Sequence, residues 1–194
     1  MANSCMVTYK CVGDEKDIAS FHDVLKKMQD KKREIKIQRG WVYAPVPLCE
    51  LVRELGGDAN GLKCRGEVTS YCLDEDGGLE IDQETAWCEQ EDVRHLIEKV
   101  YESMKVYYVA EEPGCDVYLT NDEEGRFFPY RYFLDSAQGN EEYFETIEDA
   151  AKYVSNIVGS EVEPTFEAVD AAVESYIIGH EDVFYSFHQF EIYN

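Results

Sequence analysis

The order of hydrophobic patterns between residues 4 and 120 constrains the possible folds of this chain more than any other feature. A loosely alternating stretch, Ser4–Val12, is rich in residues that favour strands and ends at a turn formed by Gly13 and Asp14. Four apolar residues then recur at helical spacing, namely Ile18, Phe21, Leu25 and Met28. The pattern predicts a strand followed by an amphipathic helix, with Asp14 as the N-cap.

A β-hairpin and a second helix are predicted farther along the chain. Residues 67–73 and 79–87 flank an acidic turn that contains Gly77 and Gly78, which is typical of a hairpin. The apolar residues between Val93 and Tyr101 recur at helical spacing and predict a helix that faces the core. Residues 41–60 predict a loop with one short helix.

An aromatic run, Arg126–Leu134, follows two further predicted strands at 105–110 and 115–120. It predicts the last strand of a β-meander, and Pro129 favours an edge or bulged position because proline has no amide donor. Rings would then project from both faces of one strand. We interpret them as buried on both sides, and an exposed aromatic binding patch is the alternative.

The C-terminal third predicts two helices and a closing strand. Thr146 and Asp149 predict a helix cap before one apolar face, a second apolar face follows Pro164, and residues 184–192 predict the strand. A polar stretch that contains glycine, 135–145, predicts a boundary. We therefore expect a domain at 1–135 and an acidic helix–helix–strand extension at 136–194, packed on the same core.

Strand–helix–hairpin–helix–strand order predicts the fold class. Hairpins between helices are typical of α+β proteins in which helices cover one face of an antiparallel sheet. We expect this architecture, with the C-terminal helical extension added to it.

Three segments also carry a family resemblance. Met1–Cys5 is followed by a strand, Gly13 and a helix, Glu84–Trp87 precedes the second helix, and Tyr107–Gly114 is an acidic strand–turn–strand. Through these segments, residues 1–135 resemble the YubB-like, ferredoxin-like family of uncharacterised bacterial, plasmid and phage proteins. The resemblance implies a ferredoxin-like sandwich without an iron–sulfur cluster and a link to bacterial mobile elements. It implies no activity, and it excludes the helices after Thr146.

The seven cysteines and the absence of apolar runs bear on the compartment. No stretch reaches the roughly 18 consecutive apolar residues of a membrane span, and Met1–Lys10 lacks the pattern of a secretory signal. The odd number of cysteines has no paired spacing, which favours thiols in a reducing cytoplasm. We expect a cytoplasmic protein that binds no membrane, no metal and no cofactor.

The net charge of −23 is distributed unevenly along the chain. Residues 1–39 hold nine Lys and Arg against six Asp and Glu, whereas residues 132–194 hold fourteen acids and one base, Lys152. Such a field repels nucleic acid and attracts basic protein surfaces. The predicted acidic surface comprises Glu141, Glu142, Glu145, Glu148, Asp149, Glu161, Glu163 and Glu167.

No catalytic motif accompanies this charge, so the sequence favours a binding role over an enzymatic one. The leading hypothesis is a protein-binding module that docks a basic partner, with a DNA mimic as its sharpest form and direct binding of nucleic acid excluded. The null hypothesis is an acidic surface that serves solubility alone. The rival hypothesis is an enzyme or small-molecule binder with a cleft beside the sheet, lined by Trp87 and Tyr108. No pattern in the sequence predicts the oligomeric state.

Overall fold

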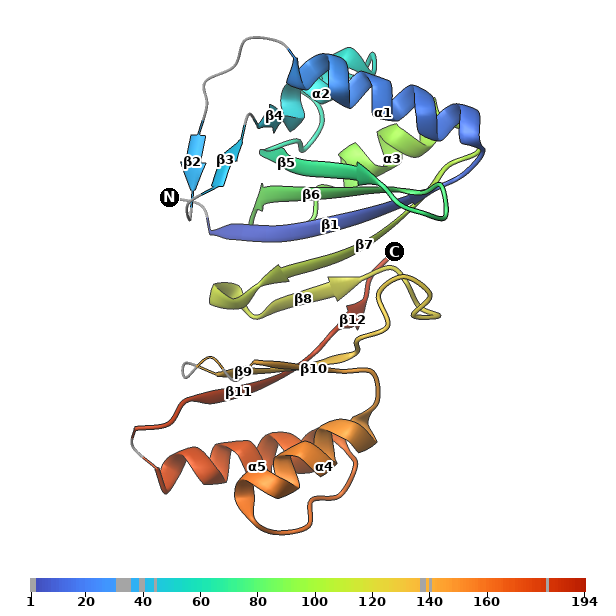
Figure 1. Cartoon of the computed structure of the whole chain (residues 1–194). Coiled ribbons are helices and arrows are strands. Elements are labelled where there is room, and N and C mark those ends of the chain that lie inside the picture. The colour runs from blue at the N-terminus through green and yellow to red at the C-terminus, as the bar shows by residue number, and fades with distance from the viewer. Residues whose placement is uncertain are drawn as a thin grey trace. The chain divides into compact units, whose positions relative to one another are not determined.

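The chain is a mixed α/β protein that divides into two compact units, Met1–Asn121 and Asp122–Asn194. A computed structural model (Figure 1) describes residues 3–30, 36–38, 41–43, 45–136, 139, 141–180 and 182–194, with only the backbone described for 36–38 and 41–43. Met1 and Ala2 of the opening segment therefore lie outside the described residues. Each unit has a hydrophobic core of its own.

The first unit contains the strand, helix and hairpin that the hydrophobic patterns predict. Its elements are β1 (Ser4–Val12), α1 (Glu15–Gln29), β2 (Lys36–Gln38), β3 (Trp41–Tyr43), β4 (Val46–Pro47), α2 (Leu48–Glu54), β5 (Gly66–Leu73), β6 (Leu79–Ala86), α3 (Glu91–Val100), β7 (Lys105–Glu112), the 3-10 turn η1 (Pro113–Cys115) and β8 (Val117–Thr120). The four apolar residues of the first helical pattern are the buried residues of α1, which confirms that helix. Asp14 is its N-cap, without a hydrogen bond from its side chain.

The main sheet of the first unit is antiparallel in every pair that joins its strands in the order β8-β7-β1-β6-β5-β4. β1 is central, because β6 and β7 pair with its two edges. Val7 lies opposite Gln83 on one side and Ala110 on the other. Residues that pair across neighbouring strands, such as these three, point to the same face of the sheet. Because side chains alternate between the two faces of a strand, the residues two positions along each strand point to that face as well.

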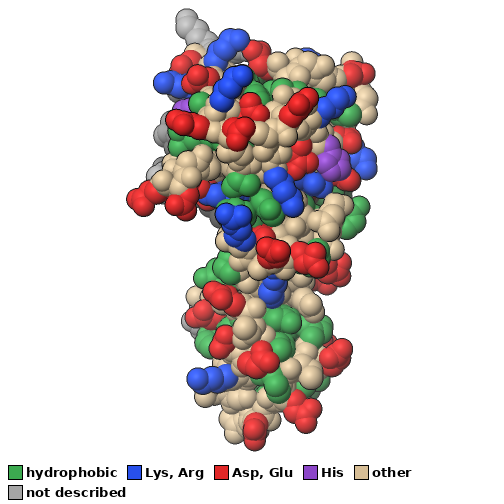
Figure 2. All heavy atoms as spheres, turned by 90° about the vertical axis from the view of Figure 1, so that its right-hand side faces the viewer, with side chains coloured by type: hydrophobic (Ala, Val, Ile, Leu, Met, Phe, Trp, Pro, Cys, Tyr) green, Lys and Arg blue, Asp and Glu red, His purple; other side chains and the backbone are tan. Residues whose placement is uncertain are grey.

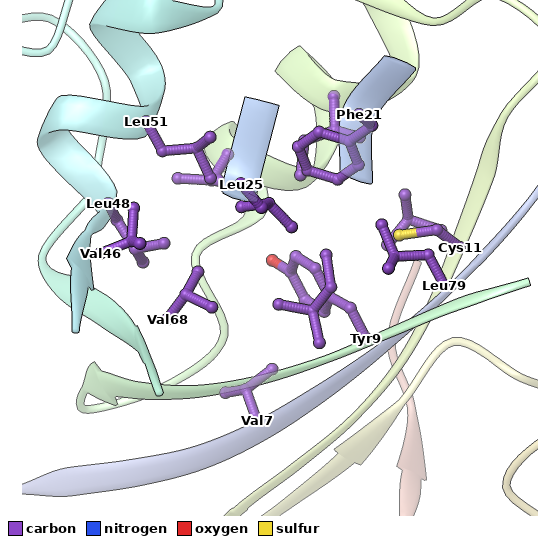
Figure 3. Close-up of a cluster of buried hydrophobic side chains, with 14 of the residues drawn as sticks. Val7, Tyr9, Cys11, Phe21, Leu25, Val46, Leu48, Leu51, Val68 and Leu79 are labelled. Atoms are coloured by element: carbon purple, nitrogen blue, oxygen red, sulfur yellow. The ribbon is translucent and has the colours of Figure 1, made fainter. Parts of the chain in front are cut away.

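That face forms the core with the helices. Side chains of β1, β5 and β6 point toward α1 and α2 in Figure 3, where Val7, Tyr9 and Cys11 lie below Phe21 and Leu25. Residues of α3 and β7, including Val93 and Tyr108, belong to the same buried cluster. The alternation of buried residues along β1 is the reason that Cys5 and Cys11 behave as small apolar side chains here.

The second unit is a small sheet packed with two helices. Its elements are β9 (Tyr132–Ser136), β10 (Glu142–Phe144), α4 (Ile147–Val158), α5 (Phe166–Ile178), β11 (Tyr185–Gln189) and β12 (Glu191–Ile192). β9 lies between β10 and β11 and is antiparallel to both. Leu134, Phe187 and Val154 are buried in its core, and the two predicted helices and the predicted cap at Thr146 are confirmed. Thr165 caps the second helix in the same way.

The predicted β-meander is wrong at its last strand. The strand begins only at Tyr132, and it pairs with β10 and β11. Before it, the amides of Phe127 and Phe128 donate to one carboxylate oxygen of Asp122, at 2.6 and 2.9 Å, and the guanidinium of Arg131 donates to the carbonyl of Asp122. These bonds hold residues 122–131 in a compact loop. The chain therefore divides at Asn121, whereas the polar stretch after residue 135 predicts a later boundary.

Aromatic side chains occupy both faces of β9, as predicted. Tyr132 stacks with Phe187 at 5.8 Å between ring centroids and packs against the core. Phe133, on the opposite face, is buried and contacts the ring of Tyr143 at 4.5 Å. Tyr130, just before the strand, is 48% exposed. Within the described part of the chain, no helix has the length and apolarity to cross a bilayer.

Candidate functional site

The eight acidic residues singled out in the C-terminal region are all exposed. They lie on β10, in the loops around the two helices, and in the first turns of α4 and α5. In the described part of the chain none of them forms an ion pair, and only Asp149 accepts a side-chain hydrogen bond, from the hydroxyl of Thr146 at 2.8 Å. Figure 2 shows acidic side chains scattered over the visible face rather than gathered in one patch.

Three of these acids stabilise helix ends. Thr146 accepts a hydrogen bond from the amide of Asp149 at 3.2 Å, which satisfies one of the unpaired donors at the start of α4. Glu148 and Asp149 lie in the first turn of α4, and Glu167 lies in the first turn of α5. Negative charge at a helix N-terminus is favourable because of the helix dipole. The remaining five have no such role in the fold.

The two residues of the predicted cleft, Trp87 and Tyr108, are not brought together. Tyr108 is fully buried in the first core, where the guanidinium of Arg94 lies 5.3 Å from its ring centroid. Trp87 is 49% exposed and follows the last residue of β6. Neither residue lines the groove at the start of β1 or the hollow along α1.

The backbone at Trp87 adopts a conformation that bulky residues rarely tolerate. Its φ angle is +75°, in the left-handed region. Four hydrogen bonds hold this turn. The amide of Trp87 donates to the carbonyl of Asn3 at 3.0 Å, and the amide of Ala86 donates to the carbonyl of Arg65 at 3.1 Å. The carbonyl of Cys88 accepts from the side chains of Thr85 and Gln90, at 2.8 and 3.0 Å. The surrounding structure thus fixes the backbone of Trp87 in this conformation.

A polar groove of about 370 Å³ lies next to this turn. Its lining comes from the start of β1, the start of β5 and the end of β6, and consists of Asn3, Ser4, Arg65, Gly66, Glu67, Glu84, Thr85 and Ala86. Gly66 is required for its shape: a Cβ there would approach the carbonyl oxygen of Glu84 to 2.5 Å, and its φ is +151°. A second groove, of about 520 Å³, follows the surface of α1 between Lys16 and Lys27.

An acidic row crosses the face of the sheet opposite the first core, at the end where the groove lies. Glu67 pairs with Glu84, Glu84 with Met6, and Met6 with Glu111, so all four side chains share one face. Ser4 donates a hydrogen bond to the carboxylate of Glu84, and Met6 is 56% exposed. Two glutamates directly opposite each other on one face repel and destabilise a strand pair.

The first core also encloses a polar cluster that the sequence patterns do not reveal. The hydroxyl of Tyr9 donates to the carboxylate of Glu89 at 2.5 Å, and Nε of Arg94 donates to the same oxygen at 3.3 Å. Burial raises the pKa of Glu89, and burial together with the Glu89 charge raises the pKa of Tyr9. Nη2 of Arg94 and both amide atoms of Gln83 are buried without a hydrogen-bond partner in the described structure.

The cysteines do not assemble into a reactive or metal-binding group. Cys5 is buried on the core side of β1, and burial raises its pKa to about 12, which keeps it a thiol. Cys72, Cys88 and Cys115 are exposed. Among the described side chains, no group of three or more His, Cys, Asp or Glu is arranged to hold a metal ion.

Sequence reasoning did not identify the groove, the left-handed turn at Trp87 or the buried Glu89–Arg94 pair. Each depends on contacts between segments that are distant in the chain, such as residues 3–4 and 84–87. Local sequence patterns do not predict such contacts. The opposition of Glu67 and Glu84 could not have been found from the hairpin turn, because a β-bulge between Val68 and Ser70 shifts the register by one residue. Comparisons of the chain with protein-family models, with curated proteins and with solved structures find no match.

Proposed function

We propose that the chain is an acidic protein-binding module that docks a basic partner on the exposed carboxylates of its second unit. The observation that carries the proposal is the lack of internal neutralisation in this region. Five of the eight acids, Glu141, Glu142, Glu145, Glu161 and Glu163, have neither an ion pair nor a helix-capping position among the described residues.

Electrostatics supports recognition at a distance more than a tight local contact. Residues 132–194 carry fourteen acids against Lys152, so a basic protein meets an attractive field before it touches the surface. At physiological salt this field decays over about 8 Å. Spread charges therefore raise the rate of encounter and make binding sensitive to salt.

The most specific version of this proposal is that the chain mimics the negative charge of DNA. Exposed carboxylates along a protein surface present negative charge to the Lys and Arg side chains that otherwise neutralise phosphates. A partner that binds nucleic acid would then exchange the nucleic acid for this chain, which itself repels nucleic acid. A reducing, cytoplasmic setting accords with the seven free cysteines.

The test compares two charge-reversed variants in affinity capture from a cell lysate, with bound proteins identified by mass spectrometry. One variant replaces four unpaired acids of the second unit by Lys. Its control replaces four exposed acids of the first unit, so that both variants undergo the same change in net charge. The two sets are Glu141, Glu145, Glu161 and Glu163, and Asp23, Glu75, Asp76 and Glu102.

We expect the wild-type chain and the control to retain the same basic proteins, and the second-unit variant to lose them. Raised salt should release the bound proteins from the wild-type chain, because the contacts are between charges. Equal capture by all three chains would contradict a docking role for the second unit and would favour an acidic surface that serves solubility alone.

We also infer that the first unit is a ferredoxin-like sandwich with the β2–α2 segment inserted between its first helix and its hairpin. The order β7-β1-β6-β5, with α1 and α3 each joining two of these strands, supports this inference. It accords with the resemblance to the YubB-like family, for which residues 1–135 carry the matching segments. An experimental structure that placed α1 and α3 on opposite faces of the sheet would contradict it.

A small-molecule binder or enzyme is the second candidate, and the groove beside the sheet favours it. The groove has a volume of about 370 Å³, and Asn3, Ser4 and Thr85 present polar groups to a ligand there. A thermal-shift screen with metabolites tests this candidate. A ligand that stabilises the chain, and loses its effect in Glu84→Gln, which changes the groove lining, would support it. Ligands that stabilise this variant as much as the wild-type chain would contradict a site at this groove.

A further inference from the structure

We propose that the outer stripe of α5, formed by Glu167, Ala171, Glu174 and Ile178, docks one basic amphipathic helix of the partner protein. The apolar side of that helix would lie against Ala171 and Ile178, and its Lys or Arg side chains would meet the two glutamates. This inference rests on the proposed function, because it assumes that the partner is basic, and it names the kind of segment that the second unit receives.

The four residues of the stripe lie on one side of α5. They are spaced four, three and four residues apart, and an α-helix completes a turn about every 3.6 residues. All four are exposed, whereas Val169 and Val173, on the opposite side, are buried in the second core. The spacing is also that of the a and d positions at which two helices pack in a coiled coil. The stripe therefore fits a second helix better than an extended segment.

The apolar part of the stripe is unusual for a solvated helix. Ile178 is 84% exposed, more than any other large hydrophobic side chain in the described structure. Ile177 beside it is half-buried and packs against the second core, so the apolar surface continues from the core to the stripe. Ala171 has a small side chain, which lets a second helix approach closely. A helix that covers Ile178 would gain free energy by removing this apolar surface from water.

The neighbouring helix, α4, has an ordinary solvated face. It packs beside α5 (Figure 1), and its exposed residues Glu148, Lys152 and Asn156 form one stripe at a spacing of four. That stripe is polar, and its acid precedes its base by four residues, a spacing that stabilises helices. In contrast, α5 contains no Lys, Arg or His. Solubility alone would favour the α4 pattern on both helices, so the apolar and acidic stripe of α5 indicates a binding role.

The two glutamates of the stripe set the charge of its partner. Neither Glu167 nor Glu174 forms an ion pair in the described part of the chain. Charged residues beside the apolar seam of two packed helices pair with opposite charges on the other helix. A second copy of this chain would bring acids against these acids, and like charges that face each other across an interface oppose binding. A helix with Lys or Arg beside its apolar side avoids this repulsion.

The experiment uses the full chain and two synthetic peptides of Lys, Leu and Ala that have the same composition. Each has about 18 residues, because shorter isolated helices are marginal in water. The ordered peptide places Leu at heptad positions a and d, and the permuted peptide spreads Leu around the helix. Calorimetry measures the affinity of each peptide for the wild-type chain, Ile178→Ser and Glu174→Gln. Leu73→Ser and Glu102→Gln, at exposed positions of the first unit, are the matched controls.

We expect the ordered peptide to bind the wild-type chain about tenfold more tightly than the permuted peptide, because only its apolar side matches the stripe. Ile178→Ser should weaken binding of the ordered peptide about fivefold and Glu174→Gln about threefold, whereas both controls should stay within about twofold. A negative heat-capacity change that shrinks in Ile178→Ser would show that apolar surface is buried. Circular dichroism spectra matching that of the wild-type chain would show that the weakened variants remain folded.

Other outcomes separate the stripe from the docking surface as a whole. Equal affinity for the two peptides, with full affinity in Ile178→Ser, would overturn the stripe and leave the proposed function intact. Weakening by Ile178→Ser, together with full affinity in the chain that carries four reversed acids in the second unit, would support the stripe and overturn the role of those acids. A wild-type chain that binds neither peptide would overturn both proposals.

Sedimentation of the free chain tests whether a second copy covers the stripe instead. We expect a monomer at the concentrations used for calorimetry, because the acids of two copies repel each other. A dimer that dissociates in Ile178→Ser would overturn the docking of a partner helix.

Discussion

Two sets of carboxylates, one in each unit, serve different purposes. In the first unit, two of them are bonded within the fold: Asp82 accepts hydrogen bonds from Thr8 at 2.9 Å and from Ser70 at 2.6 Å, and the carboxylate of Glu98 accepts one from the amide of Val106 at 2.9 Å. In the second unit, the eight acids of the predicted surface point into solvent, and Asp149 is the one with a side-chain hydrogen bond in the described structure.

This difference shows that acidic composition alone does not identify a binding surface. A carboxylate whose oxygens accept hydrogen bonds within the protein can form few bonds with a partner, whereas a solvated carboxylate can attract a basic side chain of the partner. Asp122 is an exception to this difference between the two units. It belongs to the second unit, yet its carboxylate binds two backbone amides and organises the loop before β9.

The largest effect should come from removing a partner of a first-unit carboxylate. Arg94→Met leaves the buried Glu89 without its cation, and loss of one member of a buried pair costs about 3–5 kcal/mol. Urea denaturation followed by circular dichroism measures the free energy of unfolding. A loss below about 1 kcal/mol would show that Glu89 is not dependent on Arg94.

The same carboxylate should make stability depend on pH. Because burial raises the pKa of Glu89, the folded state holds its proton more tightly than the unfolded state does. This group therefore lowers stability as pH rises from the ordinary range of glutamate, about 4.3, through the raised pKa. Glu89→Gln should remove this dependence, which unfolding curves at several pH values would detect. An unchanged slope would contradict the assignment to Glu89.

A smaller effect is expected at the cap of α4, where Asp149 is the one acid of the predicted surface with a side-chain hydrogen bond in the described structure. Thr146→Ala removes the acceptor of the Asp149 amide and the donor to its carboxylate, and should cost about 1 kcal/mol. Thr146→Ser keeps the hydroxyl and serves as the control. Thermal unfolding of the two variants separates them, and equal melting temperatures would show that this cap does not stabilise α4.

The smallest effect should come from the solvated acids. Glu163→Gln removes an exposed charge without a partner, so the free energy of unfolding should change by less than about 0.5 kcal/mol. The same urea titration applies. A loss above 1 kcal/mol, comparable with Thr146→Ala, would remove the distinction between the carboxylates of the two units.

Local patterns in the sequence predict most elements of the fold. The spacing of Ile18, Phe21, Leu25 and Met28 predicts the buried face of α1, and the acidic turn before Leu79 predicts the β5–β6 hairpin. Helix caps are equally local, since Thr146 and Asp149 are three residues apart. Such features need no knowledge of tertiary contacts.

What the sequence could not predict depends on contacts between distant segments. The run before Tyr132 has the composition of a strand, but the side chains of Asp122 and Arg131 hold it in a loop. Arg94 lies beside the apolar Val93 in α3 and carries a charge, so its burial follows only from its partner Glu89. Trp87 owes its strained backbone to hydrogen bonds with residues far away in the chain.

The most direct test of the distinction between the two units is the affinity of the chain for a hexa-arginine peptide, used as a basic probe, at low and raised salt. Calorimetry would compare the wild-type chain with the two variants that reverse four acids in the second or the first unit. We expect tight binding at low salt for the wild-type chain and the first-unit variant, weak binding for the second-unit variant, and convergence of all three at raised salt. Equal weakening in both variants would show that net charge alone governs binding and would contradict a special role for the second unit.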